Sequence, residues 1–159
     1  MTANRRSRLL VVDASVAQSA GETEHPVSSC CRDWLFGILT ICHRVVMTEA
    51  IQNEWNRHMS RFTRKWFRSM VAKKKVHQCE GVQLRRVDEA CEGLSPAEQD
   101  GLRKDLCLVE AACAGDGIVI ARDDVIQAIW HKCHDRLDVP KPITWINPVT
   151  DGVQALEHL

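Results

Sequence analysis

The sequence has no excess charge of either sign, no long apolar run and no Cys-x-x-Cys pair, and each absence excludes a class of protein. Lys and Arg number 21 and so do Asp and Glu, so the net charge points to no particular partner. The longest apolar run, residues 34–42, is too short to span a membrane. The run at 9–12 is too short for the core of a secretory signal. We therefore expect a cytoplasmic protein that has no membrane segment.

The composition is that of an ordinary globular domain. The 159 residues are 45% hydrophobic and 26% charged, which excludes a disordered or fibrous chain. A chain of this length buries enough surface to fold without disulfides or metal. It contains no internal repeat and no low-complexity segment. We predict a single domain over residues 1–159, with a core at about 8–147 and a C-terminal tail at 148–159.

Eight cysteines are many for this length. Because the sequence shows no secretory signal, they favour reduced and mostly buried thiols in a cytosolic protein over a disulfide framework. The segment His131-Lys132-Cys133-His134 resembles half of a zinc site, but the sequence offers no matching half. A cysteine-based metal or redox protein is an alternative of a different class, which thiol titration and metal analysis would discriminate.

Short apolar runs alternate with helical patterns along the chain. Residues 9–12 (LLVV) suit a strand covered on both faces, as in parallel sheets. Residues 95–98 (SPAE) form a capping box with proline in the first turn, which predicts a helix start. Residues 76–88 are ambiguous between a loop and a weak strand. The alternation predicts an α/β fold with a mainly parallel sheet. The predicted strands are 8–13, 44–48, 117–121 and 143–146, and the predicted helices are 27–42, 49–73, 95–115 and 125–134.

Aspartates follow two of these strands. Asp13 ends the first strand, and Asp123 and Asp124 end the strand at 117–121. The carboxyl ends of parallel strands form the functional crevice of an open α/β sheet. Carboxylates that converge there repel one another, and a hard divalent cation such as Mg²⁺ or Mn²⁺ relieves the repulsion. The alternative is structural, because Asp is common in turns and Asp124 can cap the next helix.

Asp105 and Glu54 differ in where the helical pattern places them. On a helical wheel Asp105 lies within the apolar face of its helix, where an unpaired charge costs several kcal/mol. Such a carboxylate needs a partner, which can be a metal, a buried arginine or helix-end amides. Glu54 instead lies off the apolar stripe of its helix, so the pattern favours a surface ion pair with Arg57 or His58.

Residues 57–75 contain eight Lys or Arg and no Asp or Glu. On one continuous helix over 49–73, an apolar stripe is formed by Ile51, Trp55, Met59, Phe62 and Trp66, which favours their packing in the core. Four of the arginines share the opposite face. Like charges so spaced repel one another, and a phosphate backbone offsets this repulsion. Phe67 falls outside the stripe and is the best candidate to stack on bases. The alternative is a solvated face that pairs with acids elsewhere. The residues predicted to bind nucleic acid are Arg57, Arg61, Arg64, Lys65, Phe67 and Arg68.

Four short motifs, in order, resemble those of the PIN-domain nucleases. The first is a strand followed by Asp-x-Ser, at residues 11–15. The second is a strand and then a helix that carries an acidic residue, at 45–55. Residues 105–113 resemble the third motif, and 118–123, a strand that closes on an aspartate, resemble the fourth. The resemblance covers nearly the whole chain.

The resemblance implies a three-layer α/β/α sandwich with an acidic pocket that binds Mg²⁺ or Mn²⁺ and hydrolyses phosphodiester bonds of RNA. RNA is then the main partner, and the family also implies a homodimer and a small antitoxin-like protein as partners. Ser15 would support the acids by hydrogen bonding. The implied catalytic residues are Asp13, Glu54, Asp105 and Asp123, and the implied metal ligands are Asp13, Asp105, Asp123 and Asp124.

Two features depart from the family pattern. Ala121 stands two positions before the fourth acid, where many members carry Thr or Ser. This departure is the basis of an alternative, a catalytically silent PIN-like module that binds RNA or a protein partner. The stretch at 54–75 is longer and more basic than in the small toxin members, which favours a stand-alone member of the family over a toxin.

Overall fold

A parallel β-sheet forms the centre of the molecule. The computed structural model describes residues 6–159, and within them five strands pair in the order β3-β2-β1-β4-β5, each neighbouring pair being parallel. The predicted α/β fold with a parallel sheet is confirmed. The strands are β1 (Leu9–Val12), β2 (Arg44–Met47), β3 (Val76–Gln78), β4 (Ile118–Ile120) and β5 (Thr144–Ile146).

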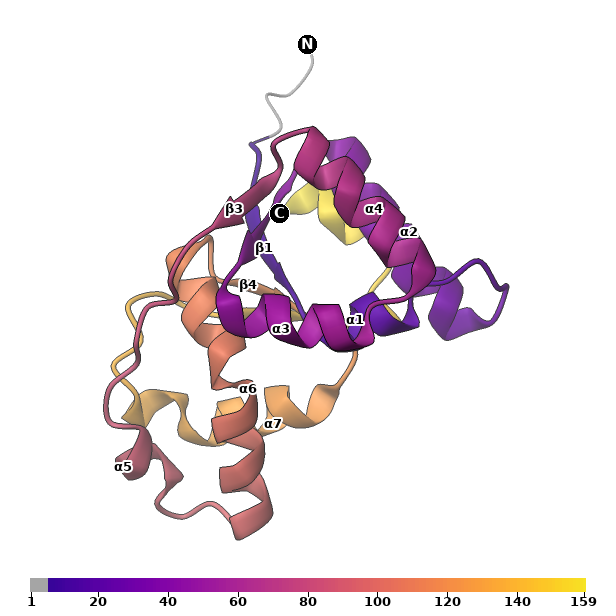
Figure 1. Cartoon of the computed structure of the whole chain (residues 1–159). Coiled ribbons are helices and arrows are strands. Elements are labelled where there is room, and N and C mark those ends of the chain that lie inside the picture. Colours follow the sequence, from indigo (N-terminus) through magenta and orange to yellow (C-terminus); the bar gives the residue numbers. More distant parts are fainter. Residues whose placement is uncertain (1–5) are drawn as a thin grey trace.

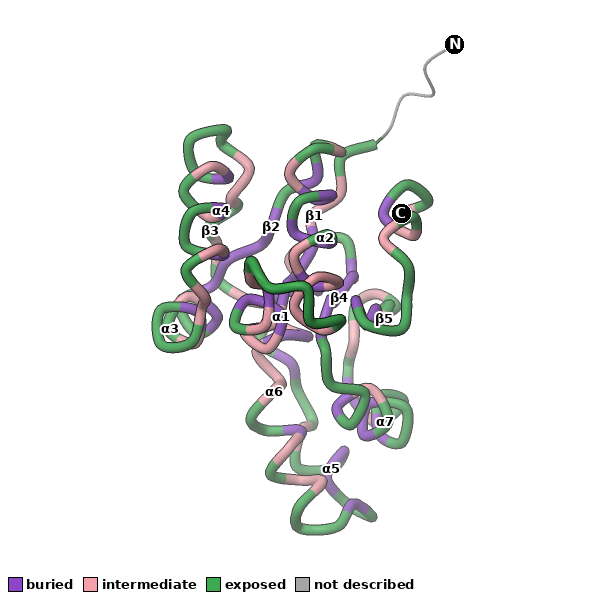
Figure 2. The backbone as a smooth tube through the Cα atoms, turned by 90° about the vertical axis from the view of Figure 1, so that its right-hand side faces the viewer, coloured by how far each residue is buried: buried purple, intermediate pink, exposed green. Residues whose placement is uncertain are grey.

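Helices cover both faces of this sheet. They are α1 (Ala14–Ser19), α2 (Pro26–Ile41), α3 (Glu49–His58), α4 (Arg61–Ala72), α5 (Val87–Cys91), α6 (Pro96–Ala114) and α7 (Asp124–Cys133), with 3₁₀ helices η1 (His134–Arg136) and η2 (Val153–His158). α2 and α4 lie on one side of the sheet, and α6 and α7 lie on the other, which gives three layers (Figures 1 and 2). No helix of residues 6–159 is long and apolar enough to cross a membrane.

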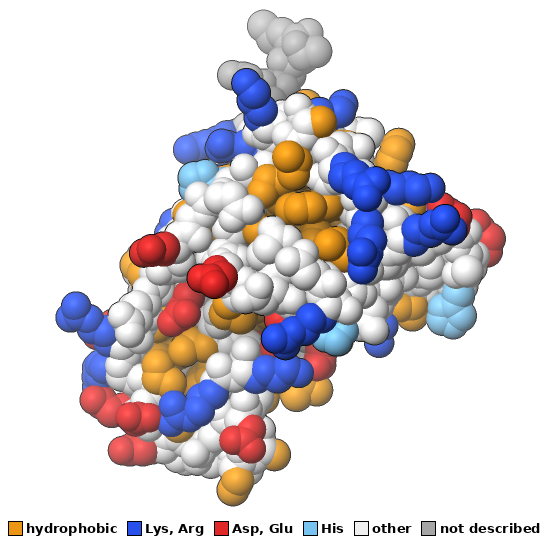
Figure 3. All heavy atoms as spheres, in the orientation of Figure 1, with side chains coloured by type: hydrophobic (Ala, Val, Ile, Leu, Met, Phe, Trp, Pro, Cys, Tyr) orange, Lys and Arg blue, Asp and Glu red, His pale blue; other side chains and the backbone are white. Residues whose placement is uncertain are grey.

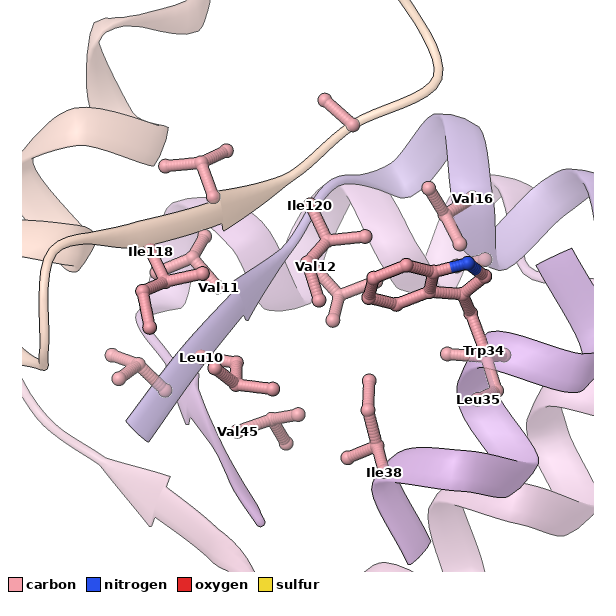
Figure 4. Close-up of a cluster of buried hydrophobic side chains, with 14 of the residues drawn as sticks. Leu10, Val11, Val12, Val16, Trp34, Leu35, Ile38, Val45, Ile118 and Ile120 are labelled. Carbon is pink, nitrogen blue, oxygen red and sulfur yellow. The ribbon is translucent and has the colours of Figure 1, made fainter. Parts of the chain in front are cut away.

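The three middle strands, β1, β2 and β4, are largely apolar because both of their faces are buried. Leu10 and Val12 of β1 are at most 1% exposed. Figure 4 shows Trp34 and Ile38 of α2 directed toward them from one side of the sheet. Helix α6 packs against β1, β2 and β4 from the other side. Strands without a polar face are those expected in the middle layer of a three-layer fold.

Two short helices were not predicted from the sequence pattern. α1 follows β1 directly, and α5 lies at the end of the segment that was ambiguous between a loop and a weak strand. The same segment also contains β3. With only six and five residues, α1 and α5 are too short for a helical period to be recognised.

The helix predicted over residues 49–73 is in fact two helices, so the predicted continuity is wrong. α3 ends at His58, Met59 has an extended backbone with ψ of 138°, and Ser60 caps α4. The Ser60 hydroxyl accepts a hydrogen bond from the Thr63 amide at 3.1 Å, and the Ser60 amide donates to the Ala17 carbonyl at 3.0 Å. The break therefore satisfies backbone groups both at the start of α4 and at the end of α1.

This break divides the predicted basic face but keeps the apolar stripe buried. Trp55 of α3 and Trp66 of α4 are both buried, with ring centroids 6.0 Å apart. Arg57 belongs to α3, whereas the other three arginines of the predicted face belong to α4. Phe67 is half-buried, and its ring centroid lies 5.6 Å from that of Trp55. Part of its surface therefore packs on the core and is not free to stack on bases.

The segment predicted as a C-terminal tail is part of the packed domain. Leu156 of η2 is 1% exposed and belongs to the main hydrophobic core. The Trp34 indole N–H donates to the Asp151 carbonyl at 3.0 Å. The buried His43 ring accepts the Arg8 amide at Nδ1 and approaches the Leu156 carbonyl with Nε2 at 3.0 Å. The core therefore extends well past residue 147.

Replacing Ser60 with Ala is expected to lower the free energy of unfolding by about 1–2 kcal/mol, because the N-cap of α4 is lost. The matched control is Ser69→Ala, whose hydroxyl bonds only to the Lys65 carbonyl of the same helix. That change should cost less than about 0.5 kcal/mol. Urea denaturation measures both variants, and equal stabilities would contradict the capping role of Ser60.

Candidate active site

The order of the strands reverses between β1 and β4. From β1 the sheet continues through β2 to β3 on one side, and through β4 to β5 on the other. The loops after two such strands diverge and leave a crevice at the carboxyl edge, where open α/β sheets bind their ligands. Asp13 directly follows β1, and Asp123 follows β4 after two residues. Both aspartates therefore lie at this switch point.

A cavity of about 580 Å³ lies at this edge. Carboxylates from four separate elements line it, namely Asp13, Glu54, Asp105 and Asp123. These are the four acids that the family resemblance implied as catalytic. They come from the loop after β1, from α3, from α6 and from the N-cap of α7. The other polar side chains in the lining are those of Ser15, Gln18, Asn53, Arg57, His58, Lys104 and Cys107.

Asp13 is held by hydrogen bonds at the start of α1. Its amide donates to the Ile120 carbonyl of β4 at 2.9 Å. Its Oδ2 accepts the Ser15 hydroxyl at 2.5 Å and the Ser15 amide at 3.3 Å, as an N-cap residue does. The Ser15 Oγ in turn accepts the Arg122 amide at 3.3 Å. Ser15 therefore supports Asp13 and also ties the loop after β1 to the loop after β4.

Asp123 and Asp124 take different places. Asp123 caps α7 by accepting the Val125 amide at 2.8 Å, and it lines the cavity. Asp124 does not line the cavity, and its Oδ1 accepts the Asn147 side-chain amide at 3.1 Å. The implied role of Asp124 as a metal ligand stays a prediction, and in this structure its carboxylate is bonded to Asn147 instead of lining the cavity.

Asn147 does not line the cavity, but it supports the loop that carries Asp123, a role that was not predicted from the sequence. It is 7% exposed and directly follows β5. Its Nδ2 also donates to the Arg122 carbonyl at 2.9 Å, and its Oδ1 accepts the Val149 amide at 2.9 Å. Asn147 therefore joins the loop after β5 to the loop that carries Asp123. Its place at the end of an apolar strand was the available signal in the sequence.

Asp105 is half-buried on α6 and faces the other acids. The pKa of Asp105 is raised from 3.8 to about 6, mainly by burial and then by the charge of Asp13, with smaller contributions from Asp123 and Glu54. The Lys104 ammonium acts in the opposite direction and lowers this pKa. The helical wheel predicted that Asp105 lies on the apolar face of its helix. The structure agrees, because Asp105 is half-buried in the wall of the cavity.

Glu54 satisfies both interpretations of its position. It pairs with Arg57 at 3.3 Å and with His58 at 3.7 Å, as the pattern of its helix favoured. It also lines the cavity with the three aspartates, as the family resemblance implied. The two ion pairs are half-exposed, so their contribution to stability is small.

The four carboxylates that line the cavity are of the chemical type that binds a divalent cation. Carboxylate oxygens are the ligands that Mg²⁺ and Mn²⁺ prefer, and the charge of an ion would relieve the repulsion that Asp105 feels. Within residues 6–159, however, no three His, Cys, Asp or Glu side chains are arranged to hold one ion together. Binding an ion at this cavity therefore requires carboxylate side chains to turn toward one another.

The thiols give little support to cysteine chemistry. Burial, with the nearby charge of Asp105, raises the pKa of Cys107 in the cavity wall to about 11, which disfavours a thiolate. Cys133 is fully buried in the hydrophobic cluster of α5, α6 and α7, whereas His131 and His134 are exposed. The His131–His134 segment therefore does not direct its three side chains to one point.

Basic side chains gather on the exposed side of α4, where Figure 3 shows a group of Lys and Arg side chains. Lys65 approaches Glu22 at 3.9 Å. The three arginines of this helix are exposed and form no ion pair with any carboxylate of residues 6–159. They are Arg61, Arg64 and Arg68.

A second cavity of about 540 Å³ adjoins the first, and Ala50, Asn53 and Cys107 line both. Its lining contains no Lys or Arg, so its charge does not suit a phosphate backbone. The acidic residues in its lining are Glu49, Glu80 and Glu110.

No protein-family model matches the sequence, and a comparison with curated proteins finds no match. The class of protein is therefore defined by the fold and the site alone. It is a three-layer α/β domain whose parallel sheet carries an acidic cavity at its switch point.

Replacing Asp105 with Asn is expected to stabilise the metal-free protein above pH 6. The pKa of Asp105 is about 6 in the folded protein and near its ordinary value of 3.8 when unfolded, so the folded state binds more protons between these values. The stability of the wild type therefore falls as the pH rises from about 4 to 6, and Asn removes this loss. We expect a gain of about 1–2 kcal/mol at pH 7.5 and almost none at pH 4, measured by urea denaturation in EDTA.

The control for this experiment is Asp100→Asn, which removes an exposed carboxylate from the same helix. It should give no gain that depends on pH. A gain for Asp105→Asn of the same size at both pH values would contradict the electrostatic account.

Proposed function

We propose that this protein is a metal-dependent endoribonuclease of the PIN-like type, which hydrolyses RNA at the acidic cavity. One observation carries the proposal: carboxylates from four elements far apart in the sequence line one cavity at the switch point of a parallel sheet. Clustered carboxylates repel one another unless a cation is bound, and their charges add to the effect of burial in raising the pKa of Asp105. The order of the four PIN-like motifs supports the same conclusion.

The side chains of the cavity have separate roles in this reaction. A divalent ion held by Asp13, Asp105 and Asp123 would lower the pKa of a bound water and offset charge on the phosphate oxygens. Glu54 would orient the attacking water, and its ion pairs with Arg57 and His58 restrain its carboxylate. The hydrogen bond from Ser15 keeps Asp13 in one orientation.

RNA is the substrate that the distribution of charge supports best. The exposed arginines of α4 are free of carboxylate partners within residues 6–159, so they are available to phosphates. Arg57 lines the cavity at the end of α3, only four residues before α4 begins. An RNA strand that follows α4 would therefore pass Arg57 as it enters the cavity.

A second candidate is a catalytically silent module that binds RNA or a protein partner. Two observations favour it: Ala121 lacks the hydroxyl that many PIN-domain nucleases carry, and no three ligands of residues 6–159 are arranged around one point. The silent module differs from the nuclease in that it would bind RNA or a protein partner without cleaving RNA.

Asp13→Asn is expected to reduce Mn²⁺- or Mg²⁺-dependent cleavage of RNA at least a hundredfold, since a carboxylate ligand becomes a neutral amide. Asn can still accept the Ser15 hydrogen bonds, so the fold should be retained. Cleavage of mixed structured and single-stranded RNAs is followed with each metal and with EDTA. The control is Asp33→Asn, an exposed aspartate of α2, which should cleave like the wild type.

Full activity of Asp13→Asn would refute the proposed site. RNA binding that weakens with salt, without any cleavage by the wild type, would favour the silent module.

The double substitution Arg64→Gln and Arg68→Gln is expected to weaken RNA binding about tenfold or more, because two phosphate contacts are lost. The slope of log Kd against log salt concentration should fall by the amount that about two contacts contribute. Fluorescence anisotropy with a labelled single-stranded RNA in EDTA at several salt concentrations measures both quantities. Arg44→Gln with Arg85→Gln removes the same charge from exposed positions outside α4 and should change neither. If both double variants bind alike, α4 is not the binding surface.

A further inference from the structure

Among residues 6–159, one basic side chain of the cavity forms no ion pair with a carboxylate. Arg57, His58 and Lys104 all line it. Arg57 and His58 both pair with Glu54. Lys104 forms no ion pair with any of residues 6–159, although the sequence neighbour Asp105 lines the same cavity. The Lys104 ammonium is thus available to an anion from outside the protein.

Its position on α6 also distinguishes Lys104 from the neighbouring arginine. Arg103 turns away from the cavity and pairs with Asp88 at 2.6 Å. Lys104 and Asp105 are neighbours on α6, and both line the cavity. An exposed ammonium therefore stands beside one of the four carboxylates that would act on a phosphodiester.

The negative charge of the cavity makes such a cation necessary for an anionic substrate. A phosphate that approaches four carboxylates is repelled, even when one divalent ion is present. Glu54 pairs with Arg57, and with His58 when that ring is protonated, so part of their positive charge is already offset at the cavity wall. A lysine ammonium is a compact, flexible point charge that suits a phosphate.

We propose that Lys104 binds a phosphate of the RNA strand at the cavity and thereby places the substrate against the carboxylates. This proposal rests on the proposed ribonuclease function and deepens it by naming a substrate-binding residue. A purely electrostatic role is the competing explanation, in which Lys104 only offsets the charge of Asp105. The two explanations differ in what the loss of Lys104 does to RNA and to the metal.

The test compares Lys104→Gln, Lys104→Arg and the control Arg85→Gln, an exposed charge that does not line the cavity. Binding of a labelled single-stranded RNA is measured in EDTA at several salt concentrations, and Mn²⁺-dependent cleavage gives KM and kcat. Lys104→Gln should raise both the Kd for RNA and the KM about tenfold. It should also reduce the slope of log Kd against log salt concentration by the amount that about one phosphate contact contributes. Lys104→Arg should restore most of the binding, and Arg85→Gln should match the wild type.

Unchanged RNA binding by Lys104→Gln, with only tighter Mn²⁺ binding, would overturn the proposal in favour of charge compensation. That result would leave the ribonuclease function standing if the wild type cleaves RNA and Asp13→Asn does not. If the wild type neither binds nor cleaves RNA, the ribonuclease function fails and the role of Lys104 fails with it.

Discussion

Repulsion among carboxylates is the constraint on which the rest of the site depends. Burial and the charges of Asp13, Asp123 and Glu54 together raise the pKa of Asp105 to about 6, so this carboxylate holds a proton more tightly than an ordinary aspartate does, and a nearby cation would stabilise its charged form. The same repulsion is the basis of the proposed metal site. Lys104 and Arg57 place positive charge in the wall of the same cavity, where Arg57 pairs with Glu54.

Hydrogen bonds at the ends of the strands hold these charges in place. Ser15 joins Asp13 to the Arg122 amide, and Asn147 joins the Arg122 carbonyl to the loop after β5. The backbone of Arg122 thereby links the loops that follow β1, β4 and β5. Asp13 and Asp123 each also cap a helix, so part of their charge is met by backbone amides. The scaffold thus fixes the backbone of the acids and leaves their oxygens to face the cavity.

The sequence was sufficient for features that depend on local pattern. The apolar strands, the capping box at Ser95 and the buried Trp55 and Trp66 all agree with their predicted places. The features that were missed depend on contacts between distant segments. The break at Ser60 exists because the end of α1 offers carbonyls to it, and the C-terminal packing exists because His43 and Trp34 bind that segment. Asn147 is defined only by its partners across the sheet edge.

The central claim is that the acidic cavity binds a divalent cation. Anomalous X-ray diffraction from crystals of the protein soaked in Mn²⁺ locates such an ion directly. The account predicts a peak in the cavity with oxygens of Asp13, Asp105 and Asp123 turned toward it, and its loss in crystals of Asp13→Asn. A cavity without a peak at saturating Mn²⁺, or an ion bound only in the adjoining cavity of Glu49 and Glu110, would contradict the account.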